Sequence, residues 1–344
     1  MSSEVDSLLA PRHAGSAPAT GRRLPSRRVA LNTAALAGAL AVLWLVPLVL
    51  DTRSVSLMSR YLLFGIAALG LDLLWGKAGL LSFGHAAVFG LGAYASGLVL
   101  AKTDWAVQQP LSVVVIGVAV SALFSLIAGV VLFYGRVKGV YFGIVTLLLT
   151  LLLEQLAATW SGLTGGFNGL LVPTGLTLGP LRLVEPNETY HSVLLIAACA
   201  FLLTRWFTRT PFGQAVEASR MNDTRAEALG YDVAWLRAVT MAIAGGLGGL
   251  AGALYAPIEG FVYPAQLGLA MSTGFIVWVA IGGRGTLLGA FIGAVFVNAV
   301  QSQLSSRVQE YWPLITGVVL LTVIMFQPAG IVGALRRLRR SSDA

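Results

Sequence analysis

Residues 111–134 read LSVVVIGVAVSALFSLIAGVVLFY, and no charged side chain interrupts this run. A helix needs about 20 apolar residues to cross roughly 30 Å of hydrocarbon, so the run is long enough to span a bilayer. Inside lipid every backbone amide needs a partner within the protein, and the run lacks the alternation of a barrel strand. It therefore predicts a transmembrane helix.

The composition of the whole chain agrees with this interpretation. Of its 344 residues 56% are hydrophobic and only 11% are charged, whereas a soluble domain carries about 25% charged residues. The single cysteine, Cys199, excludes a disulfide framework and a cysteine metal site. The formal charge of +8 lies in segments that flank apolar runs, which favours membrane orientation over nucleic-acid binding.

Similar runs recur along the chain and predict an all-α, polytopic membrane protein with about ten transmembrane helices. The ranges that we assign to these helices are 29–50, 57–75, 80–101, 111–134, 140–160, 189–207, 238–256, 267–281, 286–304 and 312–330. With this number of spans, most Lys and Arg residues fall on the side of both termini, which the positive-inside rule makes cytoplasmic. The predicted domains are a disordered basic tail (1–28), a transmembrane domain (29–333) and a second basic tail (334–344).

The segment 161–188 separates two halves that each hold five predicted spans. Its glycines and prolines exclude a regular helix, and we expect it on the outer side. A 5+5 internal pseudo-repeat is therefore possible, as in many transporters.

The most polar internal segment, 208–237, is called the coupling loop below. Pro211 can open one short helix, Thr224 and Glu227 have the spacing of a capping box for a second, and Gly230 supplies a left-handed stop. Such a short helix needs packing to be ordered. It either rests on this chain's own membrane ends or docks onto a cytoplasmic partner.

Three ionisable side chains, Asp72, His85 and Glu154, lie in or beside predicted spans. A charge at that depth costs roughly 2.5–3.5 kcal/mol on insertion scales, so a compensating role is expected. Asp72 and His85 either cap a glycine-broken hairpin or line a solute path. Glu154 is expected to face a polar cavity rather than lipid.

Small residues recur at four-residue spacing in 245–249, 248–252 and 289–293, which is typical of closely packed membrane helices. The sequence contains no phosphate-binding loop, no His-Glu-x-x-His motif and no Cys/His ligand cluster. We therefore expect transport rather than covalent chemistry, with no catalytic residue, no metal site and no cofactor in this chain.

The stretch 70–94, GLDLLWGKAGLLSFGHAAVFGLGAY, resembles the signature hairpin of permease subunits in the branched-chain amino acid and urea ABC importer family. Further matches follow in the expected order at 164–169, 211–230 and 246–255, and the resemblance covers roughly residues 55–333. The stretch 278–290, WVAIGGRGTLLGA, together with Asp72 and Trp75, resembles the urea branch. The resemblance thus implies a permease for urea or short amides; the alternative is branched-chain or other amino acids.

In that family the permease sits in the bacterial cytoplasmic membrane and forms half of the translocation path. The resemblance implies four kinds of partner: a second, homologous permease, two ATPase subunits that use ATP, an extracytoplasmic substrate-binding protein and the lipid bilayer. It adds Asn168 to Asp72, His85 and Glu154 as candidates for the solute path. It also implies that the coupling loop docks onto the ATPase through Pro211, Gly213, Arg220, Thr224, Arg225, Glu227 and Gly230.

Two rivals come from other classes. An ion-coupled secondary carrier would use Asp72 and Glu154 as coupling sites, but it would need a cluster of carboxylates at the bilayer midplane. A passive channel would need no cytoplasmic docking helix.

Overall fold

The computed structural model describes residue 38, the ranges 42–103, 105–178 and 181–308, and the isolated positions 314, 315, 317, 318, 322 and 330. Both predicted tails and most of the spans predicted at 312–330 and 29–50 lie outside the described residues. The chain divides into two units, Met1–Leu45 and Val46–Ala344, and the second carries everything described below.

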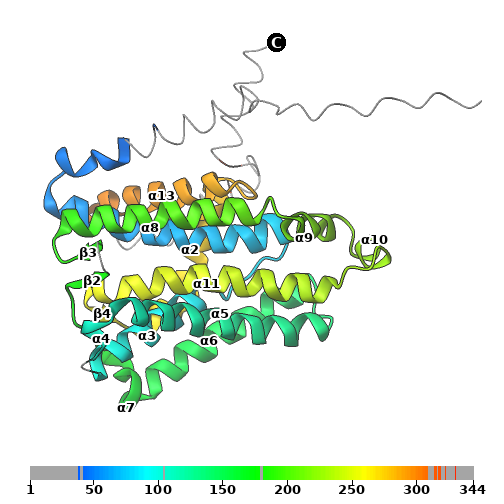
Figure 1. Cartoon of the computed structure of the whole chain (residues 1–344), viewed down its shortest axis with the longest axis horizontal. Coiled ribbons are helices and arrows are strands. Elements are labelled where there is room, and N and C mark those ends of the chain that lie inside the picture. Colours follow the sequence, from blue (N-terminus) through cyan, green and yellow to red (C-terminus); the bar gives the residue numbers. More distant parts are fainter. Residues whose placement is uncertain are drawn as a thin grey trace, which may run out of the picture. The chain divides into compact units, whose positions relative to one another are not determined.

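Helices dominate the second unit, as predicted (Figure 1). The longer ones are α2 (Thr52–Asp72), α3 (His85–Lys102), α5 (Pro110–Tyr134), α6 (Val140–Thr159), α8 (Pro186–Phe207), α9 (Pro211–Met221), α11 (Val233–Glu259), α12 (Leu269–Gly282) and α13 (Leu287–Val308). The short ones are η2 (Val46–Leu48), the π-helix η3 (Leu73–Ala78), α4 (Trp105–Gln108), α7 (Ser161–Thr164), η4 (Gly166–Asn168), α10 (Asp223–Ala228) and η5 (Pro264–Leu267). Each predicted range from 57–75 to 286–304 overlaps a helix.

Among the described residues, five helices are long and apolar enough to cross a membrane: α2 with η3, α5, α6, α8 and α11. The pair α12 and α13 would count as a sixth span if it is taken as one bent unit. The multi-pass class is therefore supported, while the count of ten, the pseudo-repeat and the side of the termini stay predictions. The span predicted at 80–101 begins later than expected, because residues 79–84 are not helical and α3 starts at His85.

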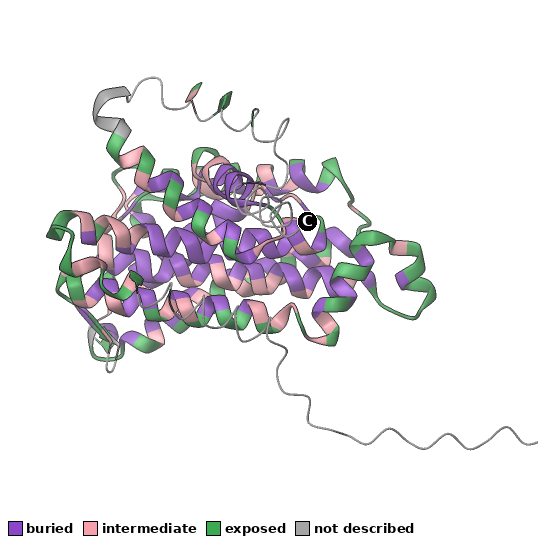
Figure 2. Cartoon of the chain, turned by 90° about the horizontal axis from the view of Figure 1, so that it is seen from above, coloured by how far each residue is buried: buried purple, intermediate pink, exposed green. Residues whose placement is uncertain are grey.

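Glycines place α11 tightly between α3 and α5. A Cβ atom on Gly252 would lie 1.9 Å from the backbone oxygen of Phe89 in α3, and one on Gly249 would lie 2.4 Å from Cβ of Ser121 in α5. No side chain fits such gaps. The small residues in 245–252 therefore allow close helix packing, as predicted. Figure 2 shows buried positions concentrated in the middle of the helical unit and exposed ones toward its ends.

The helices α12 and α13 meet at an angle of 118° across a short break. A Cβ on Gly282 would lie 1.9 Å from the backbone oxygen of Gly289, so the two helices touch where they turn. At 1.5 Å per residue, the 14 residues of α12 reach only about 21 Å, which is too short for an independent span. The two separate spans predicted at 267–281 and 286–304 are therefore better described as one broken pair.

Among the described residues of 161–185, the longest helix is the four-residue α7, so no long regular helix forms there, as predicted. It forms three short strands, β1 (Leu170–Leu171), β2 (Leu176–Leu178) and β3 (Leu181–Leu183). β1 pairs antiparallel with β4 (Phe261–Val262), and β2 pairs antiparallel with β3. The strands β2, β3 and β4 lie at the end opposite to α9 and α10 in Figure 1.

Candidate functional site

The coupling loop begins with a capped helix. The hydroxyl of Thr210 accepts a hydrogen bond from the backbone N–H of Gly213 at 3.2 Å, and Pro211 occupies the first helical position of α9. Proline suits that position because its missing N–H would have no partner there anyway. Gly213 is needed for space, since a Cβ would lie 2.3 Å from the backbone oxygen of Phe207. The prediction that Pro211 opens a helix is confirmed.

The predicted capping box of the second helix is wrong. The residue that caps α10 is Asn222, whose Oδ1 accepts from the N–H of Arg225 at 2.9 Å, while Thr224 lies one residue inside the helix. Asn222 is extended, with φ −160°, so its side chain reaches the free donors of the first turn before Thr224 can. The stop is as predicted, with Gly230 at φ +89°.

An ion pair ties α10 to α11. Arg237 donates to both carboxylate oxygens of Asp223, at 2.6 and 3.1 Å, and Lys138 approaches the same carboxylate at 3.2 Å. The Arg237 side chain is only 10% exposed, so this pair is far better shielded than a surface salt bridge. The coupling loop is therefore fastened to the helix that lies at the centre of the packing.

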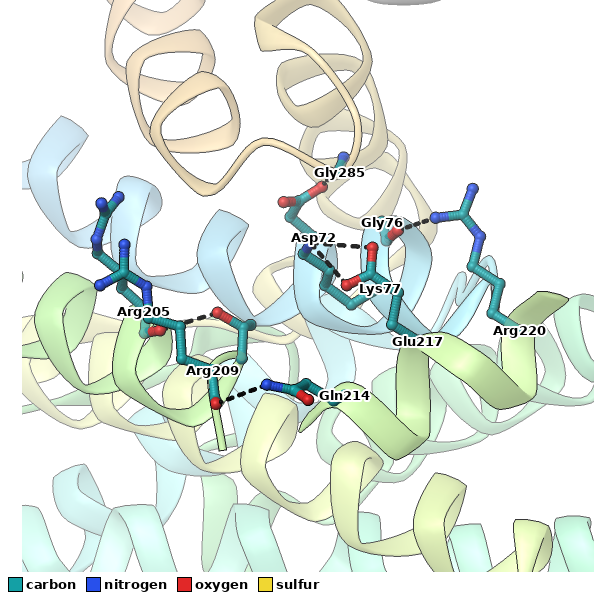
Figure 3. A network of polar contacts seen from close by, with 10 residues as sticks. Asp72, Gly76, Lys77, Arg205, Arg209, Gln214, Glu217, Arg220 and Gly285 are labelled. Carbon is teal, nitrogen blue, oxygen red and sulfur yellow. Dashed lines mark hydrogen bonds and ion pairs between the residues drawn. The ribbon is translucent and has the colours of Figure 1, made fainter. Parts of the chain in front are cut away.

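A second set of contacts ties α9 to η3. Arg220 donates to the backbone oxygen of Gly76, and Lys77 pairs with Glu217 at 3.3 Å (Figure 3). Gly79, at φ +76°, ends η3 with its Cα close beneath the Arg220 side chain. Two cations thus link the coupling loop to the π-turn at the end of α2.

A third set links η3 with the turn between α12 and α13. Asp72 accepts a hydrogen bond from the N–H of Gly285 at 2.6 Å, and a Cβ on Gly76 would lie only 2.6 Å from that same nitrogen. The guanidinium of Arg284 lies 5.3 Å from the centre of the Trp75 ring. The loop, the π-turn and the broken pair therefore form one continuous set of contacts, called the relay below.

The four candidates for the solute path do not form one site. Asp72 holds the α12–α13 turn, and His85, at the first position of α3, has Nε2 2.6 Å from the backbone oxygen of Ala67. Both side chains are buried and hydrogen-bond to backbone groups of other segments. Glu154 is partly exposed, and its carboxylate lies where a Cβ on Gly268 would sit, beside the start of α12. Asn168 is exposed in η4, and no hydrogen bond or ion pair between described residues joins any two of the four.

The face of the coupling loop that points away from the helices combines apolar and charged groups. Met221 is 84% exposed and Leu229 is 73% exposed, while Ala226 on the inner side of α10 is buried. A cavity of about 500 Å³ lies between the end of α5 and the start of α11, and its charged and aromatic lining includes Arg136, Lys138, Glu227, Tyr231 and Arg237. This surface can receive a protein partner.

The sequence analysis missed Glu217, Asp223, Arg237 and Gly285. Glu217 pairs with a lysine 140 residues earlier, and Gly285 binds a carboxylate 213 residues earlier, so local spacing gives no signal for either contact. An available signal was the balanced mixture of charges in the coupling loop, four arginines and four acids in 208–237, which predicts internal ion pairs. The described residues contain no group of three or more His, Cys, Asp or Glu that could hold a metal ion.

Comparison with known proteins places these features in a family. Residues 53–324 match the family model described as "Branched-chain amino acid transport system / permease component". The high-affinity branched-chain amino acid transport system permease protein LivM of Salmonella typhimurium is 25% identical over 322 residues, which cover 86% of this chain and 73% of LivM. No solved structure matches the chain.

Two further relatives show how widely the similarity extends. A probable branched-chain amino acid transport permease protein LivM of Methanocaldococcus jannaschii is 23% identical over 337 residues, with 81% of this chain and 94% of the relative covered. The autoinducer 2 import system permease protein LsrC of Salmonella typhimurium is 29% identical over 250 residues, with 67% and 71% covered. None of these three relatives is named a urea permease. Because the family model covers most of its length, this chain belongs to the family of permease components of branched-chain amino acid transport systems.

Proposed function

We propose that this chain is one membrane permease of an ATP-driven importer and that its solute is a branched-chain or similar aliphatic amino acid. The family match and the names of the LivM relatives support the amino-acid alternative over urea. The expected partners are a second permease, two ATPases and an extracytoplasmic binding protein, in a bacterial cytoplasmic membrane. The chain then contributes half of the path and no catalytic group.

The observation that carries the ATP-driven mechanism is the two-sided coupling loop. Its inner side is fixed to α11 and η3 by Arg237 and Arg220, while its outer side exposes Met221 and Leu229. Two large, exposed apolar side chains on an otherwise polar loop support a protein partner that covers them. A partner that covers them can move the loop as a rigid lever.

The docking surface can be tested by giving it a charge. The variant Leu229→Asp, combined with Arg225→Ala and Glu227→Ala, is expected to lose co-purification of the ATPases and ATP-dependent uptake, because an aspartate would be desolvated in the interface. The matched control is Phe167→Asp, equally exposed at 79% but at the opposite end, which is expected to retain the ATPases. Retention of the ATPases and of uptake by the triple variant would remove the coupling loop from the mechanism.

The solute can be tested in proteoliposomes that hold the complete transport system. Labelled leucine is expected to accumulate only with ATP, and excess isoleucine or valine, but not urea, is expected to compete. Accumulation of labelled urea without leucine uptake would overturn the assignment of the solute and leave the importer mechanism intact. Accumulation by this chain alone, driven by an ion gradient, would favour the secondary carrier instead.

Glu154 is proposed to line the solute path, with Asn168 nearer its outer end. Its partly exposed carboxylate lies in an otherwise apolar stretch of α6, where a charge is retained only for a function. The ammonium group of an amino acid could pair with it directly. Glu154→Gln is expected to lower leucine uptake about tenfold or more, while Gln155→Leu on the next, exposed position serves as the control. Unchanged uptake in Glu154→Gln would return the residue to a packing role.

A further inference from the structure

The π-helical turn η3 at the end of α2 lies between the coupling loop and the α12–α13 turn. In an ATP-driven transporter, movement of the first has to be transmitted to the membrane helices. On one side η3 contacts α9 of the coupling loop through Arg220 and Lys77, and on the other it contacts the α12–α13 turn through Asp72 and Gly76. Single π-turns inside α-helices occur frequently at functional sites. Gly76 serves both sides, since its backbone oxygen accepts from Arg220 while its Cα lies against Gly285.

Only one of the two carboxylate oxygens of Asp72 has a hydrogen-bond partner among the described residues. Its side chain is fully buried, and Oδ1 accepts from Gly285, but Oδ2 has no hydrogen-bond partner among the described residues. A buried carboxylate oxygen without a partner is costly, and such groups are few in native structures, so this one calls for an explanation. The cations that act on this carboxylate are Lys77, Arg284 and Arg220, yet none of them forms an ion pair with it here.

Lys77 is the cation best placed to reach the free oxygen. It lies five residues after Asp72, and a π-turn closes hydrogen bonds between residues five apart, so the two positions lie on successive turns. In this structure its ammonium group is held instead by Glu217, whose side chain is 49% exposed on α9. Figure 3 shows Lys77 and Glu217 joined on the side of η3 that faces the coupling loop. Arg284 lies over Trp75, and Arg220 is bonded to Gly76.

We propose that Lys77 exchanges between Glu217 and the free oxygen of Asp72 as the coupling loop moves, and that Asp72 thereby positions the broken pair α12–α13 for transport. When the ATPases move the coupling loop, α9 shifts relative to η3, Glu217 releases Lys77, and Lys77 then pairs with Asp72. The new charge partner weakens the hold of Asp72 on Gly285, and the α12–α13 turn becomes free to shift. In this mechanism Asp72 and Lys77 are positioning residues that never touch the solute. The proposal rests on the proposed ATP-driven function.

The test measures leucine transported per ATP hydrolysed in proteoliposomes that contain the complete system. Asp72→Asn keeps an oxygen for the N–H of Gly285 but replaces the free oxygen with an amide that does not attract an ammonium group. It is expected to leave assembly and ATP hydrolysis within about twofold of wild type while the transport ratio falls about tenfold. Lys77→Gln is expected to show the same loss of the ratio.

A second variant does not touch the buried part of the relay. Glu217→Gln removes the competing acceptor from an exposed position, so Lys77 is expected to favour Asp72 at all times and the ratio to fall at least threefold. The control is Glu259→Gln, which removes an ion pair of α2 that lies away from the relay, at 2.6 Å between Glu259 and Arg60, and is expected to leave the ratio unchanged.

Three outcomes would overturn the exchange. They are a wild-type ratio in Asp72→Asn, a wild-type ratio in Glu217→Gln, and an equal loss of ratio in Glu259→Gln. A parallel fall of hydrolysis and transport in Asp72→Asn would also contradict it, because the residue would then only hold the fold together. A wild-type system that shows no ATP-dependent uptake at all would instead contradict the proposed function.

Discussion

Helices α11 and α6 both qualify as membrane spans, yet they use their apolar residues in opposite ways. The window in α6 has the higher mean hydropathy, 1.9 against 1.5, but only 28% of it is buried within the chain, compared with 67% for α11. In water the more apolar helix would be the more buried one. In lipid it is the reverse, because hydrocarbon satisfies leucine as well as a protein interior does.

Glycine, rather than apolarity, marks the buried helix. α11 carries five glycines between positions 245 and 252, and four of them lie within 3 Å of a neighbour when a Cβ is added. α6 carries Gly143 alone, where an added Cβ would meet nothing closer than 3.6 Å. The difference teaches that close backbone approach identifies the packed core of this chain, while long leucine-rich stretches identify surfaces that face lipid or another subunit.

The largest effect is expected from Gly252→Val in α11. The new side chain would collide with the backbone of Phe89, which cannot move as a flexible side chain could. We expect a loss of about 3 kcal/mol or more, measured as thermal unfolding of the purified chain in detergent. The control is Gly246→Val on the same helix, where an added Cβ would lie 3.6 Å from its nearest neighbour. This variant should change the midpoint of thermal unfolding little. Equal effects of the two variants would break the link between glycine and burial.

The next largest effect is expected at the N-terminal end of α11. Arg237→Gln leaves the Asp223 carboxylate with the single, more exposed partner Lys138, so we expect a loss of about 2 kcal/mol. Lys138→Gln removes a side chain that is 59% exposed and should cost no more than about 0.5 kcal/mol. Thermal unfolding separates the two. An unchanged unfolding temperature in Arg237→Gln would show that α11 is held in place by its glycine contacts alone.

A smaller, pH-dependent effect is expected at the cap of α11. The hydroxyl of Tyr134 and the N–H of Trp235 donate to Asp232 and lower the pKa of its carboxyl group below the ordinary 3.8. A lowered pKa means that the stabilisation is complete above pH of about 4 and is lost as the pH falls through the folded-state value. Asp232→Asn should therefore destabilise the chain at pH 7, and its difference in stability from wild type should shrink as the pH falls below about 4. A stability difference between the variant and wild type that grows as the pH falls would contradict the capping role of Asp232.

The smallest effect is expected on the outer face of α6. Leu148→Ala and Leu152→Ala remove side chains that are 58% and 62% exposed, so the stability of the isolated chain should change by less than about 0.5 kcal/mol. If the same variants weaken the complete transport system in a pull-down assay, this face contacts another subunit. A large loss in the isolated chain would show that α6 packs within the chain more than its exposure indicates.

The sequence predicted the helical class and most of the helix ranges because each depends on residues that are neighbours in the chain. Pro211 and Gly230 likewise mark their helix ends through local backbone geometry, and the structure confirms both. The capping box at Thr224 was wrong for a local reason, since Asn222 competes for the same free donors two residues earlier. The resemblance in 70–94 gave the family, but the urea branch suggested by 278–290 with Asp72 and Trp75 is not supported by the named relatives.

By itself, then, the sequence determined a helical membrane chain with close glycine packing and a capped loop, because lipid leaves the backbone few alternatives. Only the tertiary structure decided which helix is central, that α12 and α13 form one broken pair, and that Asp72 binds a glycine 213 residues away. Such contacts depend on how separate helices meet, and many arrangements of the same apolar helices have nearly the same free energy in a bilayer. The meeting points are set by a few small residues and hydrogen bonds, whose partners no local pattern names.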